Sequence, residues 1–586
     1  MIKDLTMRKI LSLVLVSIFL LTACGPGKRN PLKNLKRLDG ERYAGSSFKY
    51  NEVEYFKSIY PLEITEVVGY RLASQVYQGL VSLNQQDLLI EPCIAKFWDI
   101  NENSTVYTFQ IRKDVFFHDD ACFEGGKGRA VKASDFKYCF DKLCASSADN
   151  QSYDWFRDKV FGAKEYFQST VDGAPLEGGV EGIWADDEKS TLTIRLNQPF
   201  SSFLNILAMV NTSVFAKEAV EKYGDALRTT KAVGTGPFIL SSVKENDKVI
   251  LKKNSNYWEK DMYDNPLPYL NAVEVSFIRD DKTALMEFEK GNLDLMYKMP
   301  LDILDEIIDD KTGDKTQKYE PYQLQKTPAL KVDYLGFLHT SKVFEDEKVR
   351  TAFNLAVDRK KLIDYTLKGT AIMAKYGIVP PAVVGYNTKS IKGYKFSPEK
   401  ARALMAEAGY ANGEGFPQVK LQINSGGGRH KLVCEAISNM LKDELNVDVQ
   451  IEELPWAQHL DKVESGSAPF YRSGWVADYP DPENFLQLYL GEHLKSLASG
   501  KSYLNTPRYN SDEYDSLYYE AISILDDDQR YEAYLKLDQN LVDASVIMPL
   551  YYEYYYRLVQ PYVVDFDANP MEFRNFKDVY FSPIIE

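Results

Sequence analysis

Three carboxylates, Asp478, Asp481 and Glu483, lie close together in the stretch RSGWVADYPDPENF at positions 472–485, beside an arginine and a tryptophan. Three kinds of chemistry use such groups. Carboxylates bind metal ions, a pair of acids can hydrolyse a glycosidic bond, and one buried carboxylate can receive a positively charged ligand. The rest of the chain has to decide among a metal site, a catalytic acid pair and a receptor for a cation.

A metal site is disfavoured by the residue pattern. The three acids do not follow the calcium-loop pattern, because the central glycine is absent and two prolines block the required turn. The five histidines, at positions 118, 339, 430, 459 and 493, form neither an HExxH motif nor a close pair, and no CxxC pair occurs. We therefore expect no metal and no cofactor, and we interpret the histidines as structural.

Catalytic motifs are equally scarce. Among 85 acidic residues some pair always lies close, so a glycosidase stays open only as an alternative based on the acid-rich stretch. No GxSxG nucleophile elbow is present. The run SGGG at positions 425–428 follows a predicted strand, but no Gly-Lys-Ser or Gly-Lys-Thr sequence comes after it. A tight turn or a cleft wall is therefore favoured there over a nucleotide site.

The N-terminus has the pattern of an export signal. Three basic residues precede an apolar run of 12 residues from Ile10 to Leu21, which is too short to span a bilayer but suits a signal-peptide core. The following Leu-Thr-Ala-Cys resembles a bacterial lipobox, which implies that residues 1–23 are removed and that Cys24 carries a lipid. A plain secretory signal with an accidental cysteine is the alternative. We expect residues 24–47 to form the tether, with Gly25–Arg37 flexible and its charges either facing an anionic membrane or merely solvated.

Length and charge limit the remaining choices. The chain has 586 residues, more than one core of about 250–300 residues holds, so two or more lobes are expected. The formal charge of −15 argues against nucleic acid as a partner. Besides Cys24 there are five cysteines, at positions 93, 122, 139, 144 and 434, and the middle three are close enough in sequence for one disulfide.

Helix and strand patterns alternate along the chain. Val106–Arg112 and Thr191–Leu196 alternate like half-buried strands, and Ser397–Tyr410 has the N-cap, first-turn proline and terminal glycine of a helix. Val419–Leu454 is typical of a strand, a helix and a second strand parallel to the first. These patterns predict an α/β protein with several lobes.

Several stretches, in this order along the chain, resemble the large extracellular solute-binding proteins, family 5, of ABC importers. They are ASQVYQGL (73–80), FFHDDACF with VKASDF (116–136), GTGPF (234–238), NSNYW (254–258), FEDEKVRTAFNLAVDRKKL (344–362), the stretch at 472–485, and IMPLYYEYYYRLVQP (547–561). In the second of these, Asp120 replaces a glycine of the family pattern and an insertion near Gly125–Arg129 interrupts it. The resemblance runs from about residue 48 to the C-terminus and implies a binding protein that performs no chemistry.

The resemblance also implies an architecture. It is an α/β fold of the periplasmic-binding-protein type, with two hinge-connected lobes, a ligand cleft between them and an extra subdomain. Lobe I is expected from residues 48–68, 198–330 and 549–586, the extra subdomain from 69–197, and lobe II from 331–548. The expected protein is a monomer of the cell envelope, held by its lipid on the periplasmic side or the outer cell surface, that delivers its ligand to a membrane permease driven by ATPases.

Within the family, the opening stretch is most similar to the oligopeptide-binding branch. The pattern R-x-G-W-x-A-D-Y implies that Asp478 binds the α-amino group of a peptide and that Arg472 can face its carboxylate, depending on peptide length. Gly474, Trp475 and Tyr479, with Tyr551 from the hinge segment, are expected to contact the ligand as well; Asp481 and Glu483 are interpreted as turn or helix-start residues. The alternative is the same scaffold with another ligand: a dipeptide, a nickel chelate, haem, an oligosaccharide or a signalling peptide.

Overall fold

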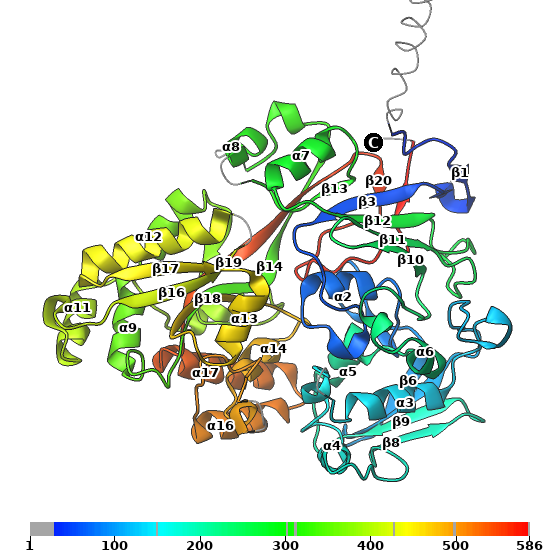
Figure 1. Cartoon of the computed structure of the whole chain (residues 1–586), viewed down its shortest axis with the longest axis horizontal. Coiled ribbons are helices and arrows are strands. Elements are labelled where there is room, and N and C mark those ends of the chain that lie inside the picture. The colour runs from blue at the N-terminus through cyan, green and yellow to red at the C-terminus, as the bar shows by residue number, and fades with distance from the viewer. Residues whose placement is uncertain are drawn as a thin grey trace, which may run out of the picture.

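The computed structural model describes residues 29–147, 150–300, 303–309, 313–425, 428–495 and 500–583. The predicted signal peptide and Cys24 lie outside these residues. Two α/β bodies stand side by side and share one long sheet (Figure 1). None of the helices in the described part of the chain combines the length and the apolar character that a bilayer crossing requires.

The shared sheet has eleven strands and runs through both bodies. On the lobe I side its strands are β10 (Phe238–Lys244), β11 (Lys248–Lys253), β12 (Ala272–Phe277), β3 (Ser47–Glu52) and β13 (Leu295–Met296); on the lobe II side they are β18 (Phe470–Val476), β16 (Val419–Asn424) and β17 (Val449–Leu454). Between the two sets lie β14 (Gln323–Phe337) and β19 (Ile547–Val559), and β15 (Ala371–Met373) adds to β19.

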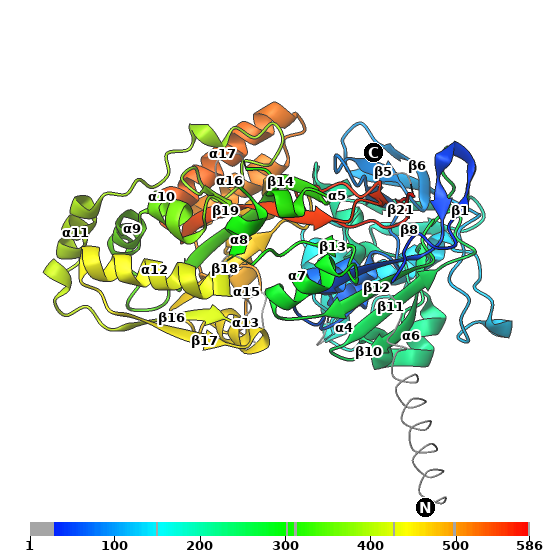
Figure 2. The same cartoon turned by 90° about the horizontal axis from the view of Figure 1, so that it is seen from above.

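Strands β14 and β19 are the connection between the bodies. They pair antiparallel along most of their length and cross the middle of the molecule in the view from above (Figure 2). Their register shifts between Pro328 and Val332 and again between Asp333 and Tyr334. Proline cannot donate a ladder hydrogen bond, and such irregularities bend a strand. The predicted boundaries after residues 330 and 548 fall inside these strands, and we propose that they mark the hinge.

A second, antiparallel sheet lies within residues 69–197. Its order is β6 (Ala95–Ile100), β7 (Val106–Ile111), β9 (Thr191–Arg195) and β8 (Ile183–Asp186). Tyr107, Phe109 and Ile111 of β7 are buried and alternate with partly exposed residues, as expected for a sheet with one face on a core. Helix α3 (Ala133–Leu143) packs against β8 and β9. The two strands predicted in this region are confirmed.

Predictions for the C-terminal half are confirmed in their main features. Helix α11 spans Pro398–Glu407, with Gly409 in a left-handed conformation after it. Ser397 is at the N-cap position, but its side chain makes no capping hydrogen bond. The predicted strand, helix and strand appear as β16, α12 (Gly428–Leu445) and β17, and the two strands pair in parallel. The disulfide prediction is wrong, because all five cysteines of the described residues are free thiols and four of them are buried.

The prediction of a flexible tether is wrong from Arg29 onward. Residues 31–34 form a turn, and β1 (Lys36–Arg37) pairs with β2 (Tyr43–Ala44). Leu32 and Leu35 pack against the main hydrophobic core. Glycine, proline and basic residues suggested a solvated linker, but two leucines gave the segment enough apolar surface to fold onto lobe I.

Three of the five histidines, His118, His459 and His493, are buried, and His339 is half-buried. All four are hydrogen-bonded, which supports the structural interpretation for them. His118 contacts the carbonyl of Gly236 at 2.9 Å, and His339 contacts that of Val546 at 3.0 Å. Burial lowers the pKa of His118, His339, His459 and His493 to about 4. In the described residues, no three side chains of metal-binding type converge on one point.

The lowered pKa values of these histidines predict that the free energy of unfolding falls at acid pH. A histidine that stays neutral in the folded protein but takes a proton near pH 6.5 when unfolded costs stability as pH falls below 6.5. For His118 the loss between pH 7 and pH 5 is about 2 kcal/mol. Urea unfolding of His118→Gln at both pH values should show a smaller loss than the natural protein. Equal losses would contradict the assignment.

Candidate ligand-binding site

Asp478 lies in the loop that follows β18, at the meeting point of the two bodies. Its side chain is only half-buried, yet burial among protein groups raises its pKa to about 7, against the opposing effect of Asn484. Within the described residues it forms no ion pair. A carboxylate that is surrounded by protein, still reachable by solvent and without a cation is suited to receive one from a ligand.

Asn484 fixes this carboxylate and the neighbouring indole. Its side-chain oxygen accepts hydrogen bonds from the backbone N–H of Asp478 at 3.0 Å and from Nε1 of Trp475 at 2.8 Å. Its Nδ2 approaches the Asp478 carboxylate at 3.5 Å. Asn484 is completely buried, so it holds both groups in place without being a ligand contact. No sequence pattern indicated the role of Asn484.

Two tyrosines from distant segments lie close enough to Asp478 for its charge to raise their pKa values. Burial raises the pKa of Tyr70, in α2 (Val67–Ala73), and the charge of Asp478 raises it further. The same two causes act on Tyr503, whose ring centre lies 6.1 Å from that of Trp475. Tyr70 belongs to the N-terminal part of the chain and Tyr503 to the range of lobe II. The surroundings of Asp478 are therefore built from both bodies.

The side chain of Arg472 is bound by other residues of the protein. Its guanidinium donates to the carboxylate of Asp333 in β14 and to Oδ1 of Asn424 at 3.3 Å. Both members of the ion pair are buried. Lys331 binds the same aspartate at 3.0 Å and Glu553 of β19 at 2.9 Å. Contact between Arg472 and a ligand carboxylate remains a prediction, and here its charge is already balanced.

Positive charge exceeds negative charge around this ion pair. Three cations, Lys331, Arg429 and Arg472, face two carboxylates, those of Asp333 and Glu553. Arg429 is the least satisfied cation: it lies 3.8 Å from Glu553, donates to Thr370 at 3.2 Å, and its buried Nε has no partner. One uncompensated cation is suited to a ligand carboxylate.

His430 and Lys298 complete this basic region. Burial and the nearby Arg472 hold the pKa of His430 well below its usual value, and its buried Nδ1 has no hydrogen-bond partner. Burial lowers the pKa of Lys298, which has no ion pair within the described residues. His430 is the exception to the structural interpretation of the histidines. No sequence pattern indicated that these two residues and Arg429 gather beside Arg472.

Three other residues predicted to contact the ligand, Tyr479, Tyr551 and Gly474, contribute to the packing and hydrogen bonding of the protein itself. Tyr479 is fully buried; its hydroxyl donates to Glu483 and accepts from Gln487 at 3.0 Å. Tyr551 is buried in β19 opposite Asp333. A Cβ on Gly474 would lie 3.1 Å from the carbonyl of Val332, which is tighter than most such contacts, so the glycine permits close strand packing. Ligand contacts by these residues remain predictions, and the buried Tyr479 is the least suited to one.

The three acids of the stretch have separate tasks. Asp481 accepts a hydrogen bond from the backbone N–H of Glu483 at 2.8 Å, at the start of α14 (Glu483–Leu486). Its predicted role as a turn and helix-start residue is confirmed. Glu483 is the first residue of that helix, and its buried carboxylate accepts from the hydroxyls of Tyr479 and Tyr518. Asp478 alone is left for a ligand.

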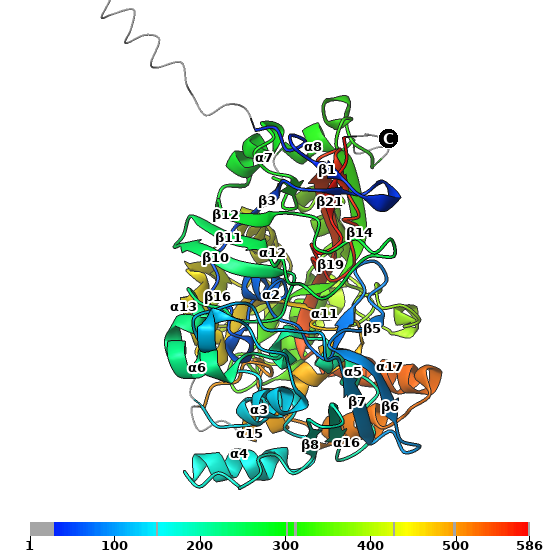
Figure 3. The same cartoon turned by 90° about the vertical axis from the view of Figure 1, so that its right-hand side faces the viewer.

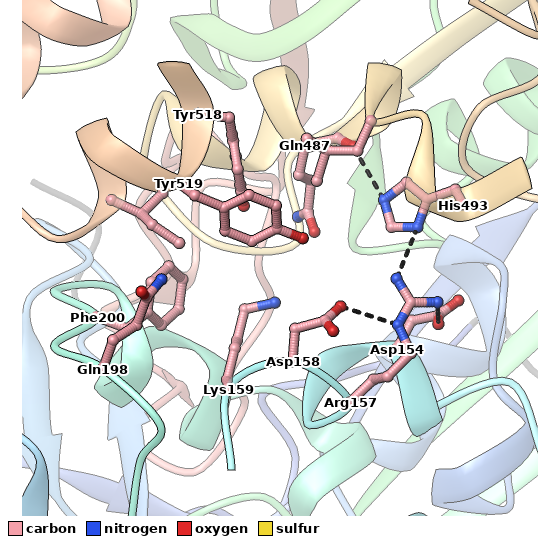
Figure 4. Close-up of a pocket in the computed structure, with 12 residues that line it drawn as sticks. Asp154, Arg157, Asp158, Lys159, Gln198, Phe200, Gln487, His493, Tyr518 and Tyr519 are labelled. Atoms are coloured by element: carbon pink, nitrogen blue, oxygen red, sulfur yellow. Dashed lines mark hydrogen bonds and ion pairs between the residues drawn. The ribbon is translucent and has the colours of Figure 1, made fainter. Parts of the chain in front are cut away.

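A separate pocket lies between two segments that are far apart in the sequence (Figure 4). One wall comes from residues 154–200 and the other from residues 487–522. Arg157 donates to Nδ1 of His493 at 3.2 Å, and Nε2 of His493 contacts the carbonyl of Gln487 at 3.0 Å. These contacts join the range of the extra subdomain to that of lobe II, so they belong to the contact between the bodies.

Known proteins are similar to nearly the whole chain. The family described as bacterial extracellular solute-binding proteins, family 5 Middle, matches residues 90–495. The chain is 27% identical over 531 residues to the periplasmic oligopeptide-binding protein OppA of Salmonella typhimurium, with 89% of this chain and 90% of the relative covered. It is 28% identical over 576 residues to heme-binding protein A of Haemophilus influenzae, with 97% and 98% covered.

A solved structure agrees with the architecture. The ABC transporter-associated periplasmic binding protein DppA from Helicobacter pylori, in complex with the peptide STSA, superimposes with a TM-score of 0.79. The two chains are 25% identical, and the match covers 92% of this chain and 99% of the other. The predicted fold class, the α/β periplasmic-binding-protein fold, is confirmed.

Proposed function

Because the chain belongs to the bacterial extracellular solute-binding proteins of family 5, which are binding proteins of ABC transporters and not enzymes, we propose that it captures peptides between its two lobes. It then delivers them to the permease of an importer. The observation that carries the proposal is the unpaired carboxylate of Asp478 between the two bodies. An α-amino group is the cation that such a carboxylate would select.

The charges of the site suit both ends of a peptide. Asp478 offers one negative charge, and the region around Arg429 and Lys331 offers one positive charge in excess. A zwitterionic ligand would balance both. Main-chain hydrogen bonds between the protein and a bound peptide do not depend on the side chains of the peptide. The aromatic surface of the half-buried Trp475 can likewise pack against peptides of any sequence. This supports a receptor with broad side-chain tolerance.

Haem is the second candidate ligand. The observation that favours it is His430, a neutral imidazole at the site whose Nδ1 has no partner. A neutral imidazole nitrogen is a common axial ligand of haem iron. Cations such as Arg429 would pair with haem propionates as readily as with a peptide carboxylate. A relative named as a heme-binding protein keeps this alternative within the family.

Calorimetry with blocked peptides tests the proposal. We expect a free tripeptide or tetrapeptide to bind at least about a hundredfold more tightly than its N-acetylated form, because acetylation removes the charge that Asp478 receives. Amidation of the C-terminus should weaken binding less, since the basic region keeps its own carboxylates. Equal affinity for free and acetylated peptides, or tight binding of haem alone, would overturn the peptide assignment.

Anchoring and closure complete the proposed function. The lipobox-like sequence supports export and attachment through a lipid on Cys24, on the outer side of the membrane that holds the permease. The irregular pairing of β14 with β19 supports hinge motion of lobe II against lobe I and the extra subdomain. The contact of Arg157 with His493 would then open and close with the ligand site.

A further inference from the structure

Arg29 is fastened to lobe I at the first described residue of the chain. Its guanidinium forms two hydrogen bonds with the carboxylate of Asp294, at 2.9 and 2.7 Å, and donates to the carbonyls of Ser47 at 2.7 Å and Gly291 at 3.2 Å. Asp294 is completely buried and also accepts from the hydroxyl of Tyr562 at 2.6 Å. A bidentate pair with a buried carboxylate is among the strongest side-chain attachments.

This attachment sets the length of the tether. Only four residues, 25–28, separate Cys24 from Arg29. Five steps of fully extended chain reach about 18 Å. If the segment to Arg37 or to residue 47 were flexible, as its composition suggests, the reach would be roughly two and a half or four and a half times as long. A lipid on Cys24 would therefore hold the surface around Arg29 close to the bilayer.

The residues that follow Arg29 carry positive charge, which favours contact with an anionic bilayer. Lys33, Lys36 and Arg37 are exposed, and no acidic residue occurs from position 25 to 38. The whole chain, in contrast, has a formal charge of −15. We define the basic edge as the exposed cations Lys33, Lys36 and Arg37. Within the described residues the two lysines have no ion pair, whereas Arg37 lies 2.8 Å from the exposed Glu41, a surface pair that contributes little. Each lysine or arginine near an anionic membrane surface adds a favourable contribution that decays within about 10 Å.

The position of the basic edge gives the orientation. Strand β1 and helix α7 (Asp281–Glu289), which lies beside the Asp294 segment, are at one end of the molecule, and helices α3 and α4 (Ala163–Val171) are at the opposite end (Figure 3). Attachment by the first end directs the four-stranded subdomain away from the lipid.

We propose that the Arg29–Asp294 pair and the basic edge together hold this receptor against an anionic lipid surface by one end of lobe I. The proposal rests on the proposed lipid at Cys24 for its tether, but the basic edge acts without it. The lipid anchor supplies the attachment, the ion pair keeps the tether short, and the cations select which face meets the membrane.

The basic edge is tested without any lipid on the protein. Residues 25–586 are mixed with vesicles of phosphatidylcholine alone or with one third phosphatidylglycerol, at low and high salt. We expect binding only to the anionic vesicles, lost at high salt, and weakened about a hundredfold in the triple variant K33Q/K36Q/R37Q. The control K96Q/K113Q/K189Q removes three exposed lysines of the four-stranded subdomain and should bind unchanged. Equal binding by the two triple variants would overturn the basic edge.

The ion pair is tested on the lipidated protein. A dye is attached at Lys189→Cys, in the subdomain, and energy transfer to a dye at the bilayer surface is measured. Transfer should be low in the otherwise natural protein and rise in Arg29→Gln, because the longer tether lets the body tilt. Equal transfer in both would overturn the clamp. Mass spectrometry that finds no lipid on Cys24 would refute the anchor separately, leaving the vesicle result to decide on the basic edge.

Discussion

Asp478→Asn is expected to weaken the binding of a peptide with a free amino terminus by roughly two to three and a half orders of magnitude. The variant keeps the shape of the side chain and removes its charge, so the buried ammonium group of the ligand would have no counter-charge. Breaking one partner of a buried ion pair costs roughly 3–5 kcal/mol, and each factor of ten in affinity corresponds to about 1.4 kcal/mol. Isothermal titration calorimetry measures the change.

The same loop offers a matched control. Asp481→Asn removes a neighbouring buried carboxylate but keeps a side-chain oxygen that can cap the start of α14. Its affinity for peptides should match that of the natural protein. Comparable losses in Asp481→Asn and Asp478→Asn would mean that the loop was disturbed and that no specific charge receives the ligand.

The pH dependence of binding gives an independent check. Burial raises the pKa of Asp478 to about 7 in the unliganded protein. Only the charged carboxylate pairs with an ammonium group, so affinity should fall by about tenfold for each pH unit below 7. The variant Asp478→Asn should show no such slope between pH 7 and pH 5. A slope that survives in the variant would assign the titration to another group.

The proposed receptor for an amino group came from a family resemblance, and that resemblance was readable because its residues are neighbours in sequence. Arg472, Trp475 and Asp478 come from one strand and the loop after it, so their spacing is preserved in the sequence itself. The separate roles of Asp478 and Asp481 also follow from local chemistry. An aspartate two residues before a short helix has a backbone N–H to accept from, whereas Asp478 has only Asn484.

The basic part of the site could not be predicted for the opposite reason. Lys331 comes from β14, Arg429 and His430 from the start of α12, and Glu553 from β19. Their proximity is a product of the shared sheet, and no local pattern distinguishes these cations from the other lysines and arginines. Arg29 is a similar case, because its partner Asp294 lies 265 positions away.

A buried cluster of five charges, four from the lobe I ranges and Arg71 from the start of the subdomain range, also could not be predicted from the sequence. Glu52 of β3 binds Arg71 at 3.1 Å and Arg574 at 2.9 Å, and Glu572 binds Arg71 at 2.9 Å, Arg574 at 2.6 Å and Arg557 of β19 at 3.4 Å. All five side chains are buried. The cluster ties an N-terminal strand and helix to the C-terminal segment and to the lobe I end of a hinge strand.

Glu572→Gln is therefore expected to lower the free energy of unfolding by about 3–5 kcal/mol. The variant leaves three buried guanidinium groups facing one carboxylate, and an uncompensated buried charge is far costlier than the lost attraction alone. Urea unfolding at pH 7 measures the loss. Glu221→Gln is the control: this exposed glutamate lies 3.6 Å from Lys217, and removing such a surface pair should change stability by less than about 0.5 kcal/mol.

Glu572 should contribute to the fall in the free energy of unfolding at acid pH. Burial alone would raise its pKa, but Arg574, Arg71 and Arg557 together lower it to about 2, below its usual 4.5. A carboxyl group with a lowered folded-state pKa contributes stability above pH 4.5 and loses it as pH falls toward 2, here roughly 3 kcal/mol. Glu572→Gln should lack this part of the acid loss, while the histidines still titrate. If both proteins lose the same free energy of unfolding between pH 4.5 and pH 2, the three arginines do not hold this carboxylate in its charged form. The cluster would then not stabilise the contact between the N-terminal and C-terminal segments that it joins.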